Sequence, residues 1–130
     1  MSGFINSTPI IQLFLENPLL AKRYPEEGYV AAVVDTGYEG FVAVPNKIFH
    51  RLALDQLHQE RRTVMLANGV LLNSTGTYAT IHLLNPDSKL DGFVETYPDL
   101  DEILVGTEML TNLRVILDYC TKRIRLAKCV

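Results

Sequence analysis

Hydrophobic and polar residues alternate over much of the chain, which is the pattern of β-strands with one buried face. Within residues 7–16, Ile11, Leu13 and Leu15 fall on one face and Gln12 falls on the other. The same pattern, with the Gly, Pro, Asn and Asp residues that interrupt it, predicts the later strands. They lie at residues 29–34, 41–44, 77–84 and 90–95, with an apolar run at 103–106 and hairpins at 62–72 and 115–126.

Helical periodicity is confined to two short segments. Ile48, Phe49 and Leu52 recur at helical spacing after Pro45, a residue that suits the first turn of a helix. They predict one short amphipathic helix over residues 46–56. The sequence is therefore mainly β, with one or two short helices.

The second helix is expected directly after Gly106. Thr107 is a good N-cap, and Glu108 would place a carboxylate at the positive end of the helix dipole. Two turn signals lie earlier in the chain. Asn68-Gly69 favours a primed turn at the tip of the 62–72 hairpin, and residues 74–76 predict a break between strands. Residues 19–28 are expected to form a loop.

An acid stands at the end of the most hydrophobic strand. The run 30–34 contains only valine and alanine, as in a strand buried on both faces, and Asp35-Thr36-Gly37 follows it. A buried strand rarely ends on an ionisable side chain unless that side chain has a partner or a task. For the tripeptide alone, a strand end followed by a polar turn is an equally good interpretation.

Composition limits the classes of function. A chain of 130 residues with 48% hydrophobic residues predicts one domain, 1–130, with its own core. A net charge of −3 is too small to indicate nucleic acid or an anionic membrane as a partner. Cys120 and Cys129 do not form a disulfide framework, so a reducing compartment fits them better. With no export signal and no apolar run of membrane-spanning length, we expect a cytoplasmic protein.

Motifs for other chemistries are absent from the sequence. His50 and His58 are expected at the surface, because no His-Glu-x-x-His and no third metal ligand accompanies them. We therefore expect no metal and no cofactor. There is no P-loop, and a chain this short lacks the second phosphate loop of actin-like kinases. The basic residues at 122–128 indicate a solvated sheet edge, because no aromatic residues for base stacking are interleaved with them.

Three blocks of the chain together resemble the small single-domain branch of the retropepsin-like aspartic proteases. The blocks are 33–54, which contains Asp35-Thr36-Gly37, then 64–69, and finally 103–110 with its continuation to Ile124. The resemblance implies a closed antiparallel acid-protease barrel with two psi-shaped loops at its centre. It implies that Leu104, Val105 and Gly106 pack beside the acid and hold it. It also implies that Ala67, Asn68 and Gly69 form the tip of a flap over bound peptide.

The resemblance implies an aspartic endopeptidase whose substrate is a peptide or protein. Such chemistry needs two carboxylates that share one proton, and this chain holds a single Asp-Thr-Gly. A homodimer is therefore required, with Asp35 of each chain as the catalytic residue. Thr36 would hydrogen-bond across the two-fold axis, and Gly37 would offer its backbone N–H to the carboxylate.

The chain departs from the retroviral pattern in two places. Tyr38 replaces a small residue and would narrow or fill the cleft, and Thr107-Glu108 replaces a basic–acidic pair. Tyr38 keeps a second function open, in which the same dimeric fold binds a peptide under its flap without cutting it.

Overall fold

The structure is a computed structural model that describes residues 3–66 and 68–129. It is mainly β, with two short helices, as the alternating pattern predicts. The strands of the main sheet are β1 (Gly3–Ile5), β2 (Thr8–Glu16), β3 (Arg23–Tyr24), β4 (Val30–Val34), β5 (Val42–Ala43), β6 (Glu60–Met65), β7 (Leu71–Leu83), β8 (Ser88–Thr96) and β9 (Leu104–Val105). A separate hairpin is formed by β10 (Leu113–Asp118) and β11 (Arg123–Lys128).

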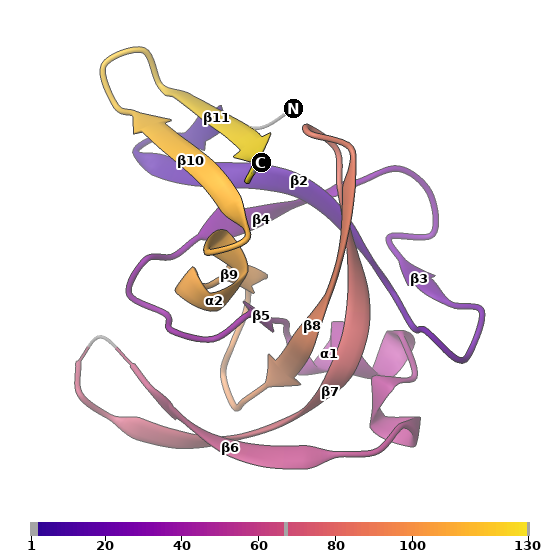
Figure 1. Cartoon of the computed structure of the whole chain (residues 1–130). Coiled ribbons are helices and arrows are strands. Elements are labelled where there is room, and N and C mark those ends of the chain that lie inside the picture. Colours follow the sequence, from indigo (N-terminus) through magenta and orange to yellow (C-terminus); the bar gives the residue numbers. More distant parts are fainter. Residues whose placement is uncertain (1–2, 67, 130) are drawn as a thin grey trace.

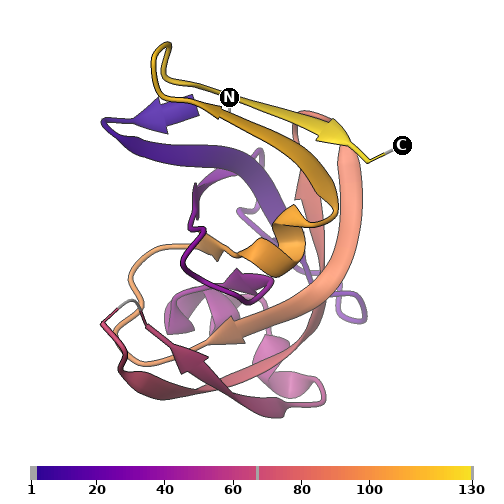
Figure 2. The ribbon, with the colours of Figure 1, turned by 60° about the vertical axis from the view of Figure 1, so that its left-hand side comes forward.

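The main sheet follows the order β1-β2-β4-β9-β5-β8-β7-β6, and β2 pairs additionally with β7. Most pairs are antiparallel, and two pairs, β4–β9 and β5–β8, are parallel, so the expected antiparallel arrangement holds for most of the sheet and not for all of it. The hairpin of β6 and β7 extends from one end of the molecule, and the β10–β11 hairpin lies at the opposite end (Figure 1). Figure 2 shows α2 and β9 between these two ends.

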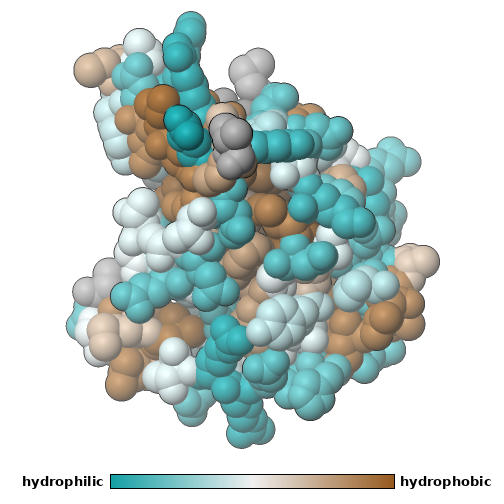
Figure 3. All heavy atoms as spheres, viewed as in Figure 1, coloured by the Kyte–Doolittle hydropathy of each residue, from teal (hydrophilic) through white to brown (hydrophobic). Residues whose placement is uncertain are grey.

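The core lies on the inward faces of these strands. Ile11, Leu13 and Leu15 of β2 are all fully buried, so the face predicted for residues 7–16 is confirmed. Fully burying a side chain of this size contributes about 1.5–3 kcal/mol. Figure 3, viewed as in Figure 1, shows a surface on which hydrophilic and hydrophobic residues are mixed. Hydrophobic residues gather there near the two hairpins, among other places.

The predicted helix over residues 46–56 is interrupted. Helix α1 (Asn46–Arg51) ends before Ala53, which has a left-handed φ of 54°, and the 3-10 turn η1 (Leu54–Gln56) follows. The buried Asn17 side chain explains why the chain turns here. Its Nδ2 donates to the carbonyl oxygens of Leu52 and Ala53, at 2.9 and 3.3 Å, so these groups have a partner outside the helix.

The predicted break at residues 74–76 is also wrong, because β7 continues through it. Gly76 is a packing position in this strand. A Cβ atom there would lie 2.6 Å from the Phe93 ring, so glycine makes room for a buried aromatic side chain. The sequence signal for a turn was in fact a signal for close packing across the sheet.

Helix α2 (Thr107–Leu110) is the second predicted helix, but it begins one residue earlier than expected. Gly106 occupies the N-cap position and no side-chain cap is formed, so the prediction of Thr107 as N-cap is wrong. Two further strands were not predicted. Strand β3 lies within residues 19–28, which were expected to form a loop, and β1 lies in a segment with no predicted structure; both pair with β2.

Candidate active site

Asp35 lies where β4 ends, at the start of the acid loop, which we define as residues 35–40. Its backbone N–H donates to the Val105 carbonyl oxygen at 3.0 Å, and its own carbonyl oxygen accepts from the Tyr38 N–H at 3.1 Å. Its side chain is half-buried, and Oδ1 accepts from the Gly37 N–H at 2.9 Å. The carboxylate is therefore oriented by the backbone of its own loop.

Strand β9 supports the acid loop from the side. Leu104 pairs with Val33 and Val105 pairs with Val34, in parallel register. The Gly106 N–H then donates to the Phe41 carbonyl oxygen at 3.0 Å. The predicted packing segment 104–106 thus lies directly beside Asp35.

Gly106 allows the two segments to approach closely. A Cβ atom at this position would lie 2.1 Å from the Gly40 carbonyl oxygen and 2.7 Å from that of Tyr38. Because both contacts are with backbone, no side-chain movement could relieve them. The Thr107 N–H also donates to the Tyr38 carbonyl oxygen at 2.9 Å, which ties the start of α2 to the acid loop.

Thr36 and Gly37 form the outer edge of the loop. Both residues are exposed, and the Thr36 hydroxyl makes no hydrogen bond within the described residues. Its position leaves the hydroxyl available to a group outside the chain.

Asp35 lines a cavity of about 400 Å³. The cavity is also lined by the segment 97–102 and by Leu66 and Leu72, which belong to the hairpin of β6 and β7. We call this hairpin the flap hairpin. Tyr97 is only 9% exposed and makes no hydrogen bond within the described residues. Burial raises the pKa of its hydroxyl above the ordinary value, and the Asp35 carboxylate adds to this rise. The cavity therefore offers a protonated phenol and a carboxylate to whatever binds.

The hairpin of β6 and β7 carries the residues predicted as the flap. Its tip is held by the Gly69 N–H, which donates to the Leu66 carbonyl oxygen at 2.9 Å, and by Asn68 Oδ1, which accepts from the Val70 N–H at 3.0 Å. A primed turn centred on Asn68-Gly69 requires a positive φ at Asn68, and of these two residues only Gly69 has one, at 83°, so the predicted primed turn is wrong. Ala67 lies outside the described residues.

The flap hairpin exposes hydrophobic side chains. Met65, Val70 and Leu71 are all more than two-fifths exposed, and hydrophobic spheres gather at this end of the molecule in Figure 3. A second cavity, of about 500 Å³, lies between strand β6 and the acid loop, and Leu66 lines both this cavity and that of Asp35. The flap hairpin therefore stands beside two cavities that flank the acid loop.

Tyr38 lines the second cavity without filling it, and the narrowing of the cleft that the sequence suggests stays a prediction. Its side chain is 5% exposed and packs in a hydrophobic cluster with Ala43, Val64 and Leu104. Its hydroxyl donates to Oε2 of Glu95, a buried residue near the end of β8. Burial first, and this hydrogen bond second, raise the pKa of Tyr38 well above its ordinary value. Sequence reasoning missed Glu95, because it stands at the end of the predicted strand 90–95, where a carboxylate is ordinarily expected to face solvent.

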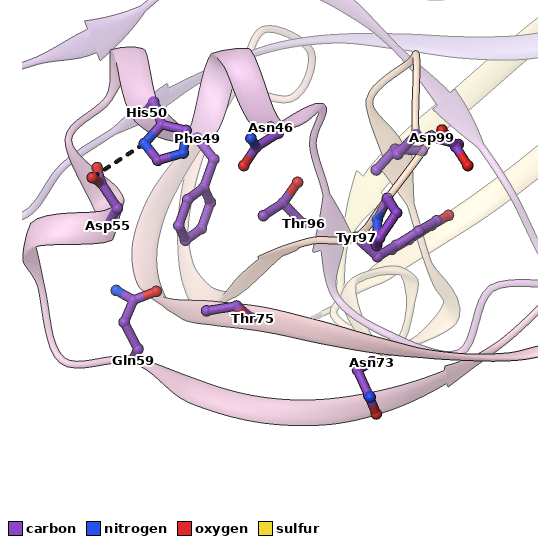
Figure 4. A pocket seen from close by; sticks show the side chains of 12 residues that line it. Asn46, Phe49, His50, Asp55, Gln59, Asn73, Thr75, Thr96, Tyr97 and Asp99 are labelled. Atoms are coloured by element: carbon purple, nitrogen blue, oxygen red, sulfur yellow. Dashed lines mark ion pairs between the residues drawn. The ribbon is translucent and has the colours of Figure 1, made fainter.

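A third cavity, of about 800 Å³, lies on the far side of the 97–100 segment (Figure 4). His50, on α1, pairs with Asp55 across 3.1 Å at one side of this cavity. His50 and His58 are both exposed, so their predicted place at the surface is confirmed. Thr96 lies in the middle of the view, between Phe49 and Tyr97, and its buried hydroxyl has no partner within the described residues.

Three further features bear on other functions. Across residues 3–66 and 68–129, no three His, Cys, Asp or Glu side chains are grouped as a metal ion would require. No helix in this part of the chain is long and apolar enough to span a membrane. Cys120 and Cys129 are both exposed and unbonded.

The fold can be compared with those of solved structures. The chain is similar to the crystal structure of a retropepsin-like aspartic protease from Rickettsia conorii, with a TM-score of 0.65 over 99% of this chain and 91% of that chain. Only 16% of residues are identical, so the likeness establishes the fold and not the activity. The expected retropepsin-like fold is confirmed at this level.

The sequence comparison places the chain in a family. It belongs to the same family as an uncharacterized protein of Archaeoglobus fulgidus, to which it is 48% identical over 126 residues. The match covers 97% of this chain and 98% of that protein. No family model matches the chain.

Proposed function

We propose that the protein is an aspartic endopeptidase that acts as a homodimer. The observation that carries this proposal is the placement of Asp35. It ends a buried strand, its backbone is bonded to β9, and its half-buried carboxylate lines a cavity beside the flap hairpin. An acid that only closed a turn would need none of these supports.

The proposed chemistry uses two carboxylates and one water. One ionised carboxylate takes a proton from the water, which attacks the peptide carbonyl. The other carboxyl is protonated, donates a hydrogen bond to the carbonyl oxygen, and later helps to protonate the leaving nitrogen. Two carboxylates in contact cannot both be ionised, so they share a proton and titrate as a pair. The Gly37 N–H, 2.9 Å from Asp35 Oδ1, fixes the orientation of this carboxyl group.

The second carboxylate comes from a second chain in this proposal. Asp35 is in the single Asp-Thr-Gly of the sequence, so one chain carries half of the site. The exposed hydroxyl of Thr36 would then hydrogen-bond across the two-fold axis. We also propose that the β2–β7 pairing closes the main sheet into the expected barrel, and that the enzyme works in the cytoplasm, where its two unbonded cysteines would stay reduced.

A peptide or protein substrate would lie between the flap hairpin and the acid loop. The two cavities that share Leu66 give room on both sides of the loop. Asp99, Asp101 and Glu102 line the cavity that contains Asp35, and no lysine or arginine does so. This charge favours peptides with a basic side chain near the cleaved bond.

Replacing the carboxylate of Asp35 tests the proposal. Asp35→Asn keeps the shape of the side chain but removes the shared proton, so cleavage of a fluorogenic peptide library should fall by about 10⁴-fold or more. Asp87→Asn is the matched control, because Asp87 is an exposed acid between β7 and β8 that lines none of the three cavities. It should retain cleavage within about threefold, since it takes no part in the proton transfer.

Two outcomes would contradict the proposal. Full activity in Asp35→Asn would remove Asp35 from the mechanism. If wild-type protein binds library peptides but cleaves none between acidic and neutral pH, the chain is the peptide-binding module that the sequence left open.

A further inference from the structure

Glu95 is a buried carboxylate that the proposed chemistry does not use. It is 3% exposed, and it accepts one hydrogen bond at each oxygen, from the Tyr38 hydroxyl at Oε2 and from the Ser74 hydroxyl at Oε1. An ionised carboxylate so deeply buried is strongly unfavourable without such donors. Both hydroxyls belong to buried residues, and Tyr38 and Glu95 also form part of the lining of the second cavity.

The two donors come from segments with different tasks. Tyr38 belongs to the acid loop, and its N–H bonds the carbonyl oxygen of Asp35. Ser74 lies in β7, the strand that forms one side of the flap hairpin, and its hydroxyl also lies 3.3 Å from the Arg62 carbonyl oxygen of β6. Glu95, on β8, therefore links the loop that holds the acid to both strands of the hairpin beside it.

The surrounding backbone is shaped for this link. A Cβ atom at Gly40 would lie 2.3 Å from the Tyr38 hydroxyl oxygen and 2.7 Å from Glu95 Oε2. A Cβ atom at Gly106 would lie 2.7 Å from the Tyr38 ring. Gly40 and Gly106 thus leave space for the Tyr38 side chain, whose hydroxyl reaches the Glu95 carboxylate.

We propose that Glu95 is a positioning residue that fixes the acid loop to the flap-bearing strands. The inference rests on the proposed peptidase function and deepens it. Glu95 touches no reacting atom; it acts through Tyr38, whose backbone bonds Asp35, and through Ser74, which sets the base of the flap hairpin. The Glu95 carboxylate therefore holds both the flap hairpin and the acid loop in place.

Conservative variants test this link one contact at a time. Tyr38→Phe and Ser74→Ala each remove one hydroxyl and leave the buried packing in place. Each should lower kcat about tenfold and leave KM within about twofold, because the loss is in placement of the acid and not in substrate contacts. Tyr78→Phe is the matched control, since the Tyr78 hydroxyl, on β7, contacts only Arg62 among the described residues and its side chain is exposed.

Hydrogen exchange gives a second readout that needs no activity. The amides of Gly37 and Tyr38 are bonded within the acid loop, and they should exchange about tenfold faster in Tyr38→Phe. The amides of Ile11 and Ala32, in the paired strands β2 and β4, should keep their wild-type rates. In Tyr78→Phe all four amides should exchange as in the wild type.

The double variant Tyr38→Phe/Ser74→Ala decides whether the two hydroxyls act through one residue. If they do, the first change already cuts the link, so the double variant should be at most about twofold slower than the slower single variant. Two tenfold effects that multiply to about a hundredfold would overturn the proposal. So would unchanged exchange of Gly37 in Tyr38→Phe.

These results separate the link from the peptidase function. If no variant and no wild-type protein cleaves peptides, but Gly37 exchange rises in Tyr38→Phe and not in Tyr78→Phe, the peptidase proposal fails and the link stands. If the wild type cleaves and Tyr38→Phe changes neither kcat nor Gly37 exchange, the link fails and the peptidase proposal stands.

Discussion

At the scale of single residues, two acids differ in how well the sequence reveals them. Asp35 follows a run of valine and alanine, and an ionisable side chain in that position already indicates a special environment. Glu95 stands at the end of a predicted strand, where a carboxylate facing solvent is the ordinary expectation. Its burial depends on Tyr38 and Ser74, which are 57 and 21 residues away in the chain. No local sequence pattern predicts that Glu95 contacts Tyr38 and Ser74.

The buried tyrosines give a prediction at this scale. The raised pKa values of Tyr38 and Tyr97 mean that their phenols stay protonated when an ordinary tyrosine, with a pKa of about 10, ionises. Because these protons are lost more readily from the unfolded chain, the unfolded state binds fewer protons above that pH. The free energy of unfolding should therefore fall as pH rises past about 10.

Alkaline titration followed by ultraviolet absorbance checks this expectation. Of the six tyrosines, the fraction due to Tyr38 should ionise last, and only together with unfolding. Tyr38→Phe should remove that late phase. Tyr119→Phe, which alters a ring that is 55% exposed, should leave it intact. A late phase that survives in Tyr38→Phe would show that another residue causes it.

At the scale of elements, long amphipathic strands were predictable and interruptions were not. Strand β2 was found because Ile11, Leu13 and Leu15 alternate with residues of the other face, and the buried face is the predicted one. The errors share one cause, which is tertiary contact overriding a local signal. Gly76 reads as a turn but makes room for Phe93, and the helix after Pro45 stops where the Asn17 side chain bonds its last carbonyl oxygens.

Gly76 supplies a prediction at this scale. Gly76→Ala would push a methyl group to 2.6 Å from both the Phe93 ring and the Val94 carbonyl oxygen, so we expect a loss of about 1–3 kcal/mol in the free energy of unfolding. Chemical denaturation measures it. Gly3→Ala, in β1, is the matched control, because its Cβ would meet only Lys122 O, at 3.9 Å, and the change should stay within about 0.5 kcal/mol. Equal stability of the two variants would contradict the packing role of Gly76.

At the scale of the whole molecule, the fold was predictable from three blocks of sequence and the sheet order was not. The blocks indicated which segments form the acid loop, its support and the flap hairpin, and the likeness to a solved retropepsin-like structure agrees with that fold. The two parallel pairs, β4–β9 and β5–β8, join segments about 50 to 70 residues apart. Periodicity reports which face of a strand is buried, but it carries no information on which strand lies next to it.

The proposed dimer makes a prediction at the same scale. Since each chain supplies one Asp35, activity per chain should fall when the protein is diluted below the dissociation constant of the dimer. Mixing wild-type chains with a tenfold excess of Asp35→Asn chains, then allowing exchange, should suppress most of the wild-type activity. The same excess of Asp87→Asn chains should not. Activity that is independent of both dilution and mixing would contradict a shared site.

The parallel pairing of β4 with β9 also has a consequence for the order of events during synthesis. Val33 and Val34 find their parallel partners only in Leu104 and Val105, and the Asp35 amide bonds Val105. A nascent chain that ends before these residues leave the ribosome has no means of fixing the carboxylate. Any hydrolytic potential of Asp35 thus arises only after Leu104 and Val105 have been synthesised and have paired with β4, so a shorter nascent chain should not cut itself or its neighbours.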